Sequence, residues 1–150
     1  MRSLVSMRAV QLSGPHQFAV VDVPAPRPAR GEALVDLRAA ALNHRDVWIK
    51  AGAYAGLNWP VIPGSDGAGV VVEVADPSDA DWVGREVVIN PSFDWGSREE
   101  VQGAAFTILG NPRQGTHAQR IAVPVQQLAP KPTHLEWRQA AALPLAGLTA

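Results

Sequence analysis

The chain has 150 residues, of which 47% are hydrophobic and 18% are charged, enough for one globular domain with an apolar core. Its 13 Lys and Arg against 14 Asp and Glu leave a net charge of -1, and no basic cluster stands out, so nucleic acid and anionic membrane surfaces are not expected partners. The absence of cysteine excludes disulfides, iron–sulfur clusters, thiolate zinc sites and cysteine nucleophiles. No apolar run is long enough to span a membrane, and we expect a cytoplasmic protein.

Short apolar runs separated by 13 prolines and 13 glycines are typical of short strands joined by tight turns. We expect strands at 8–12, 18–24, 33–40, 69–74, 86–89, 116–123 and 127–130. In the third run Ala33, Val35 and Leu37 alternate with Leu34, Asp36 and Arg38, a pattern that predicts a half-buried strand. The sequence therefore predicts a mainly β domain.

Helix signals are few. Residues 43–51 can form a short helix with Asn43 at the N-cap, Asp46 at the third helical position and Gly52 at the end. A second helical region is expected from about Glu136 to Ala142, interrupted at Pro144 and resuming towards the end of the chain. The chain ends in an apolar run, 145–150, so we expect it to be part of a longer protein, with a domain at 1–128 and a connecting segment at 129–150.

The glycine-rich stretch 64–69 invites comparison with nucleotide-binding loops. Such loops follow a strand and open a helix, so that the helix N-terminus faces the phosphates. Here Pro63 precedes the glycines and the β-prone run 70–74 follows them. We therefore expect a tight turn with close backbone packing and no cofactor-phosphate site in this chain.

Two motifs at matching spacing carry a family resemblance. Residues 43–46 read Asn-His-Arg-Asp, and residues 63–70 read Pro-Gly-Ser-Asp-Gly-Ala-Gly-Val. This frame resembles the medium-chain dehydrogenase/reductase family, in which a cysteine opens the first motif and a Gly-His-Glu triplet opens the second. The likeness runs from Arg8 to the terminal run 140–150, which in the family leads into the cofactor-binding half. It implies a GroES-like, partly open β-barrel with a few short helices, and a doubly wound Rossmann half outside this chain that binds NADPH or NADH.

The zinc ligands of that family are replaced here. Asn43 stands at the cysteine position, Ser65 at the histidine position, and Asp66 replaces the glutamate. Amide and hydroxyl groups are poor zinc ligands beside thiolate and imidazole, so we expect no zinc and no other metal. Without that Lewis acid, reduction of an activated acceptor such as a quinone or conjugated carbonyl is more feasible than alcohol oxidation. The sequence is accordingly similar to the zinc-free quinone oxidoreductase-like branch.

The resemblance also suggests site residues. Asn43 is the first choice for a catalytic or cofactor contact, in addition to its helix-capping role, and Thr149 matches a threonine that approaches the nicotinamide. Tyr54 is a candidate proton donor or substrate clamp, with plain packing as the alternative, and Trp48 a candidate wall of the acceptor pocket. Ser65 can hydrogen-bond an acceptor oxygen or satisfy its own turn, with Asp66 beside it at the substrate.

Other polar residues receive simpler interpretations. We expect His44 and Arg45 to form a solvated pair beyond the helix cap. The segment 91–115 matches the lobe that holds a structural zinc in relatives but has no cysteine; its acidic residues, Asp94, Glu99 and Glu100, are expected in a solvated loop.

The leading hypothesis is the substrate-side half of a zinc-independent NAD(P)H-dependent oxidoreductase, inactive without its cofactor half and a homodimer as the full-length protein. One alternative is a non-catalytic GroES-like assembly module, although such a module has no need of the two polar motifs. The other is an alcohol dehydrogenase-like enzyme with an unconventional metal site.

Overall fold

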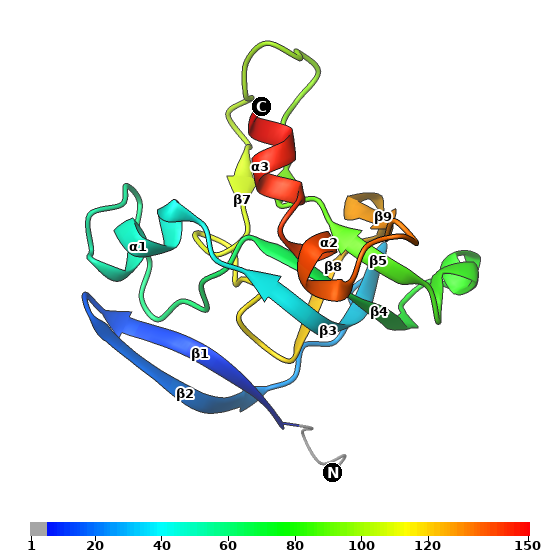
Figure 1. Ribbon diagram of the computed structural model, residues 1–150, viewed down its shortest axis with the longest axis horizontal. Helices are drawn as coiled ribbons and strands as arrows, with labels where there is room; N and C mark the ends of the chain where they lie inside the picture. The colour runs from blue at the N-terminus through cyan, green and yellow to red at the C-terminus, as the bar shows by residue number, and fades with distance from the viewer. Residues whose placement is uncertain (1–5) are drawn as a thin grey trace.

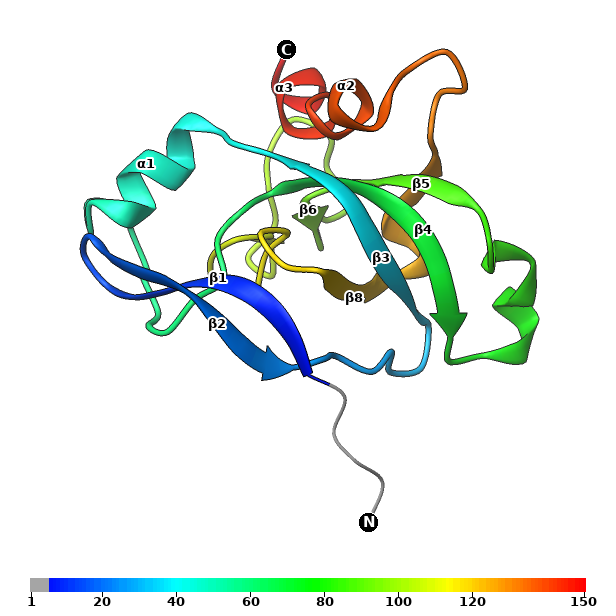
Figure 2. The same cartoon turned by 60° about the horizontal axis from the view of Figure 1, so that its bottom comes forward.

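The computed structural model describes residues 6–150, and a five-stranded antiparallel sheet forms its centre. The strand order is β8-β3-β4-β5-β9, and β3, β4 and β5 arch side by side in Figure 2. These strands are β3 (Glu32–Ala41), β4 (Asp66–Val74), β5 (Glu86–Ile89), β8 (Arg120–Pro124) and β9 (Leu128–Pro130). Two short 3-10 helices, Pro77–Trp82 and Val125–Gln127, precede β5 and β9.

A separate hairpin lies beside the sheet and below helix α1 in Figure 1. It pairs β1 (Ser6–Gly14) with β2 (Gln17–Pro24). Single bridges connect β1 to the rest of the molecule, from Leu12 to Val61 and from Ala9 to Ala118. The hairpin is therefore attached at its sides while the sheet remains an open, incompletely closed barrel. The mainly β architecture expected from the sequence is confirmed.

The expected strands all occur, with one shortened and two added. The 116–123 run is a strand only from Arg120, because Thr116 and His117 donate their backbone N–H groups to the carbonyls of Gly64 and Pro63 in a turn rather than in a ladder. The added pair consists of β6 (Ser92–Phe93) and β7 (Thr107–Ile108), two residues each and too short for periodicity to detect.

The expected alternation in β3 is wrong at Leu34, which is buried together with Ala33 and Val35. The pairing of β3 with β4 shifts register between Leu34 and Val35, a bulge that interrupts the simple two-residue period. The apolar core of the barrel is made by buried residues of the sheet together with Phe93 of β6 and Leu109 after β7. The sheet residues are Ala33, Val35, Val71, Val87, Ile89, Ile121, Val123 and Leu128.

Three short helices complete the fold. Helix α1 (His44–Lys50) begins after Asn43, whose extended backbone (φ -121°, ψ 158°) makes it the N-cap, and Gly52 follows it with φ 73°. Helix α2 (Trp137–Ala141) packs its buried alanines, 140 and 141, on Ala68 of the sheet, and α3 (Pro144–Thr149) follows it, above α2 in Figure 1 and beside it in Figure 2. Pro144 opens α3 at a position where its missing N–H costs nothing. The domain boundary expected at residue 128 stays a prediction.

Within residues 6–150, no helix has the length and apolar character needed to cross a membrane.

Candidate functional site

The first turn of α1 is tied to the glycine turn before β4 through Asp46. One carboxylate oxygen of Asp46 accepts the backbone N–H of Asn43 at 2.9 Å, and the other accepts that of Gly64 at 3.2 Å. Asp46 is itself buried, so both contacts are shielded from water. The two sequence motifs, 18 residues apart at this contact, thus meet at one place.

Asp66 joins three segments of the chain. Its carboxylate accepts a hydrogen bond from the Asn43 side-chain amide and another from the backbone N–H of Leu145, each at 2.8 Å. Leu145 lies in the first turn of α3, where an acidic acceptor complements the unpaired N–H groups. Asp66 therefore connects the cap of α1 to the beginning of α3.

The side chain of Asp66 is only 1% exposed, and burial raises the pKa of its carboxyl above the ordinary value of 3.8. The hydrogen bonds from Asn43 and Leu145 oppose that change in pKa, whereas the nearby charge of Asp46 reinforces it. Two hydrogen-bond donors thus stabilise the ionised Asp66 carboxylate, whereas its burial disfavours the charge.

Ser65 points away from Asp66 and into a buried network. Its hydroxyl donates to the carbonyl of Leu109 at 2.9 Å and accepts from the Arg45 guanidinium at 2.6 Å. The Ser65 side chain is fully buried, so the protein itself uses the hydroxyl that was predicted to face an acceptor oxygen. This geometry favours the structural interpretation of Ser65, and a catalytic role stays a prediction.

The expectation of a solvated Arg45 is wrong. His44 is exposed, but Arg45 is only 9% exposed, and its guanidinium also donates to the carbonyls of Leu109 at 2.6 Å and Asn111 at 3.1 Å. A helical signal for this burial was present, because Arg45 lies four residues before the fully buried Ile49 and therefore on the same face of α1. The contacts with 109 and 111 carry no sequence signal, because they join residues more than 60 positions apart.

The glycine turn is confirmed as close packing. Gly64 has φ 96°, a conformation that favours glycine, and a Cβ on Gly69 would lie 2.3 Å from the backbone oxygen of Asp36. The two glycines let β3, β4 and the preceding turn approach closely enough to set Asp66 beside Asn43.

The remaining predicted residues are spread over different surfaces. Trp48 is 50% exposed and stacks on His44 with ring centroids 5.5 Å apart, on a different side of α1 from Asn43. Tyr54 is half-buried and packs next to the cluster of Leu12, Ile49 and Val61. Thr149 is exposed, and its hydroxyl donates to the carbonyl of Leu145 within α3. The structure brings Asn43 and Asp66 together but does not gather Trp48, Tyr54 and Ser65 around them. Trp48 projects from another part of α1, Tyr54 lies in the loop after that helix, and Ser65 is held by Arg45 and Leu109.

Asn43 does line a cavity, of about 330 Å³, between α1 and the β1–β2 hairpin. Its walls are mainly apolar, and they are formed by Val10, Leu12, Phe18, Leu42, Val47 and Pro63, with Asp46, Lys50 and His117 as the other polar groups. Leu42 is 81% exposed, which leaves the approach to Asn43 open.

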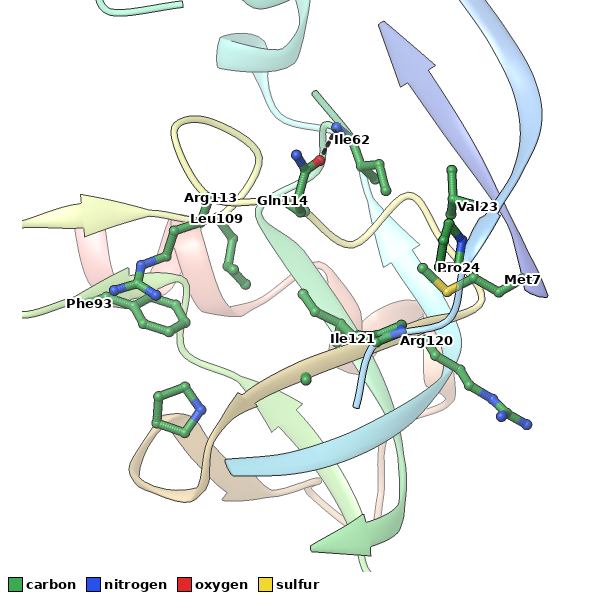
Figure 3. Close-up of a pocket in the computed structure, with 14 residues that line it drawn as sticks. Met7, Val23, Pro24, Ile62, Phe93, Leu109, Arg113, Gln114, Arg120 and Ile121 are labelled. Carbon is green, nitrogen blue, oxygen red and sulfur yellow. Dashed lines mark hydrogen bonds between the residues drawn. The ribbon is translucent and has the colours of Figure 1, made fainter. Parts of the chain in front are cut away.

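A larger cavity, about 440 Å³, lies elsewhere, at the open end of the barrel (Figure 3). Its polar side chains are already engaged: Gln114 accepts the backbone N–H of Ile62 at 2.6 Å, and Arg120 pairs with Asp36 at 3.0 Å. Met7 and Pro24 close one side and Phe93 lies on the other. No polar groups converge there for chemistry, and we regard it as the unfilled end of the barrel.

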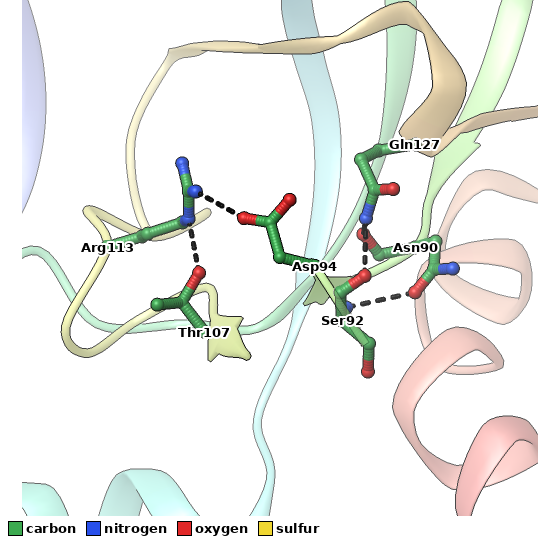
Figure 4. A network of polar contacts seen from close by, with 6 residues as sticks. All are labelled: Asn90, Ser92, Asp94, Thr107, Arg113 and Gln127. Atoms are coloured by element: carbon green, nitrogen blue, oxygen red, sulfur yellow. Dashed lines mark hydrogen bonds and ion pairs between the residues drawn. The ribbon is translucent and has the colours of Figure 1, made fainter. Parts of the chain in front are cut away.

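The lobe between β5 and β8 is held by ordinary polar contacts (Figure 4). Arg113 donates to Thr107 at 2.6 Å and pairs with Asp94 at 3.2 Å, and its guanidinium covers the ring of Phe93 at 4.4 Å. On the other side, Gln127 donates to the carbonyls of Asn90 and Ser92. These contacts fix the base of the lobe without any cysteine.

The donor set at the position of the family's catalytic zinc does not fit that metal. The Asn43 amide is committed to Asp66, and the Ser65 hydroxyl faces a positive guanidinium. Within the described residues 6–150, no three His, Asp or Glu side chains are grouped so as to hold a metal ion.

The family model for the alcohol dehydrogenase GroES-like domain matches residues 29–133, which include both motifs and the whole central sheet. The chain belongs to this family. It is thereby part of the medium-chain dehydrogenase/reductase superfamily, and its partly open β-barrel is GroES-like.

Three similar proteins illustrate the relationship. A zinc-type alcohol dehydrogenase-like protein of Schizosaccharomyces pombe is 34% identical over 142 residues, covering 93% of this chain and 41% of the relative. A chloroplastic quinone oxidoreductase of Triphysaria versicolor is 30% identical over 151 residues, covering 96% and 40%. The crystal structure of an NAD-dependent alcohol dehydrogenase superimposes with a TM-score of 0.81 at 39% identity, covering 93% and 43%. The chain thus spans about two fifths of the length of these oxidoreductases.

Proposed function

We propose that this chain is the substrate-side half of a nicotinamide-dependent oxidoreductase that works without zinc. The single observation that carries the proposal is the Asn43–Asp66 pair, in which a buried carboxylate holds a half-buried amide; Asn43 stands where the family has a zinc-binding cysteine, and Asp66 replaces the glutamate beside the zinc-binding histidine. A carboxylate only accepts hydrogen bonds when ionised, so it selects the amide nitrogen of Asn43 and leaves the amide oxygen to other partners.

This orientation suits a contact with a nicotinamide cofactor. The Asn43 side chain also takes part in the capping box of α1, with the backbone N–H of Asp46 as its donor, so a ribose hydroxyl or carboxamide N–H would use the second lone pair of the amide oxygen. A bound NADH or NADPH would supply the hydride. The chain's own contribution is to orient Asn43 through Asp66 and to hold the acceptor against the apolar side chains of Leu42 and Val47.

The acceptor class follows from the absence of a suitable metal position. Without a Lewis acid, hydride transfer is easiest to an acceptor that is already electron-poor, a quinone or a conjugated carbonyl. The mainly apolar cavity beside Asn43 agrees with such an acceptor. The relatives support the same class, since they include the quinone oxidoreductase and a crotonyl-CoA carboxylase/reductase of Cereibacter sphaeroides, 34% identical.

The test is Asn43→Ala in the full-length enzyme, assayed for cofactor affinity and turnover with a quinone and an enone. We expect a loss of roughly 3- to 10-fold, the value of one neutral hydrogen bond. Asn58→Ala is the matched control, because Asn58 is exposed and only its backbone makes a contact, to Asn111. Unchanged kinetics for Asn43→Ala would defeat the assignment of this site.

Metal analysis separates the alternatives. The proposed enzyme retains turnover after exhaustive chelation and contains no stoichiometric metal. A dehydrogenase with an unconventional metal site loses activity under the same treatment, and a GroES-like assembly module has no turnover with either acceptor before it.

A further inference from the structure

The Arg45 guanidinium is a buried cation without a carboxylate partner. No ion pair to it is present within residues 6–150, and its charge is met by the Ser65 hydroxyl and the carbonyls of Leu109 and Asn111. Burying a charge is costly unless several groups compensate it. An apolar residue would pack more easily at this buried position. The hydrogen-bond donors of Arg45, which an apolar residue lacks, therefore point to a role for the guanidinium.

The face of the Arg45 guanidinium contacts a loop that has no regular structure. Tyr54 lies in the segment between Gly52 and Gly56, both in the left-handed region with φ 73° and 66°. The guanidinium carbon lies 5.0 Å from the centroid of the Tyr54 ring, a stacking arrangement of the cation–π type.

Asn111 holds the same loop from the far side. Its side chain, 2% exposed, donates to the carbonyl of Gly56 at 3.2 Å and accepts the backbone N–H of Asn58 at 3.3 Å. Arg45 binds the backbone carbonyl of this same Asn111. Arg45 and Asn111 are therefore coupled, and together they contact the tyrosine loop at its aromatic ring and along its backbone.

We propose that Arg45 is a positioning residue that sets the Tyr54 ring in one place relative to α1, by stacking on the ring while its two terminal nitrogens are fixed by Ser65, Leu109 and Asn111. A planar guanidinium can do both at once because its donors lie in the plane and its face remains free. Lysine has the charge but neither the plane nor the fork. Any kinetic consequence rests on the function proposed above, whereas the positioning itself does not.

The test uses the only tyrosine of the chain. Incorporation of 3-fluorotyrosine reports on Tyr54 alone in the ¹⁹F spectrum of the 150-residue protein, with no need for activity. Arg45→Met keeps an unbranched stem and removes the charge and the fork. We expect the Tyr54 signal to move, by more than its linewidth, towards its value in the urea-unfolded chain. The control is Arg38→Met, an arginine 51% exposed and paired only with Asp36, and it leaves the signal in place.

Arg45→Lys distinguishes positioning from simple charge. We expect it to displace the signal as Arg45→Met does; a signal at the wild-type position in either variant overturns the proposal. If Arg45→Met does not fold, the lysine variant decides alone.

In the full-length enzyme the same two substitutions lower acceptor turnover by about tenfold and leave the KM for NAD(P)H unchanged. Displaced ¹⁹F signals with unaltered turnover would refute the functional importance of Tyr54 and leave the positioning intact.

Discussion

Asp66→Asn should change the pH dependence of stability in a direction fixed by the burial of this carboxylate. Because the folded-state pKa of Asp66 is raised above 3.8, the folded protein binds more protons than the unfolded chain at pH values just above 3.8. The free energy of unfolding therefore falls as pH rises through that window. The loss of stability is complete once Asp66 is ionised in the folded state. Asparagine does not ionise, so the Asp66→Asn variant does not undergo this loss.

The free energy of unfolding decreases by roughly 1 kcal/mol for each tenfold difference in the Asp66 acid constant between the folded and unfolded states. Urea unfolding followed by tryptophan fluorescence, at a series of pH values from below 3.8 to neutrality, gives the free energy of unfolding for both proteins. We expect the wild-type value minus the Asp66→Asn value to decrease as pH rises. A difference that increases with pH would refute the reasoning.

The substitution also has a functional consequence. The new amide can accept from Leu145 through its oxygen and donate through its nitrogen, which requires the Asn43 amide to turn its oxygen inward. In the full-length enzyme we expect Asp66→Asn to weaken cofactor binding as Asn43→Ala does, although the wild-type fold is kept.

Three further outcomes are expected. Gly69→Ala should destabilise the chain by about 2 kcal/mol or more in urea unfolding, because its Cβ would lie 2.3 Å from a backbone oxygen. Gly147→Ala, with open space around the new Cβ, should be neutral or stabilising. Equal effects of the two substitutions would contradict the packing argument. Tyr54→Phe should leave stability unchanged, since no hydrogen bond to its hydroxyl is present in the described residues, and should lower acceptor turnover only if Tyr54 donates a proton. The isolated chain should not oxidise NADPH, and measurable turnover would contradict the assignment to a half-enzyme.

Much of the fold followed from local patterns. The runs that became β3, β4 and β5 are strongly β-prone and bounded by glycine and proline, and the cap and stop residues placed α1 at His44–Lys50. The strands β6 and β7 could not be predicted, because two residues carry no periodicity and their pairing depends on a contact across the lobe.

The site was predicted less completely. The sequence indicated that Asn43 and Ser65 stand at former ligand positions with Asp66 beside Ser65, and the structure brings the side chains of Asn43 and Asp66 within 2.8 Å. The sequence could not indicate that the Ser65 side chain points away from Asp66. Neighbouring residues at the start of a strand project to opposite faces, and the buried partner, Arg45, determines which face Ser65 occupies.

The sequence by itself determined the longer strands, the short helices, the family and the replacement of zinc ligands, because these depend on residue type and on spacing along the chain. Only the tertiary structure decided that Arg45 is buried and that Asp66 binds the first turn of α3, 79 residues away. Buried polar groups must find hydrogen-bond partners wherever the folded chain supplies them, and those partners are set by packing between distant segments.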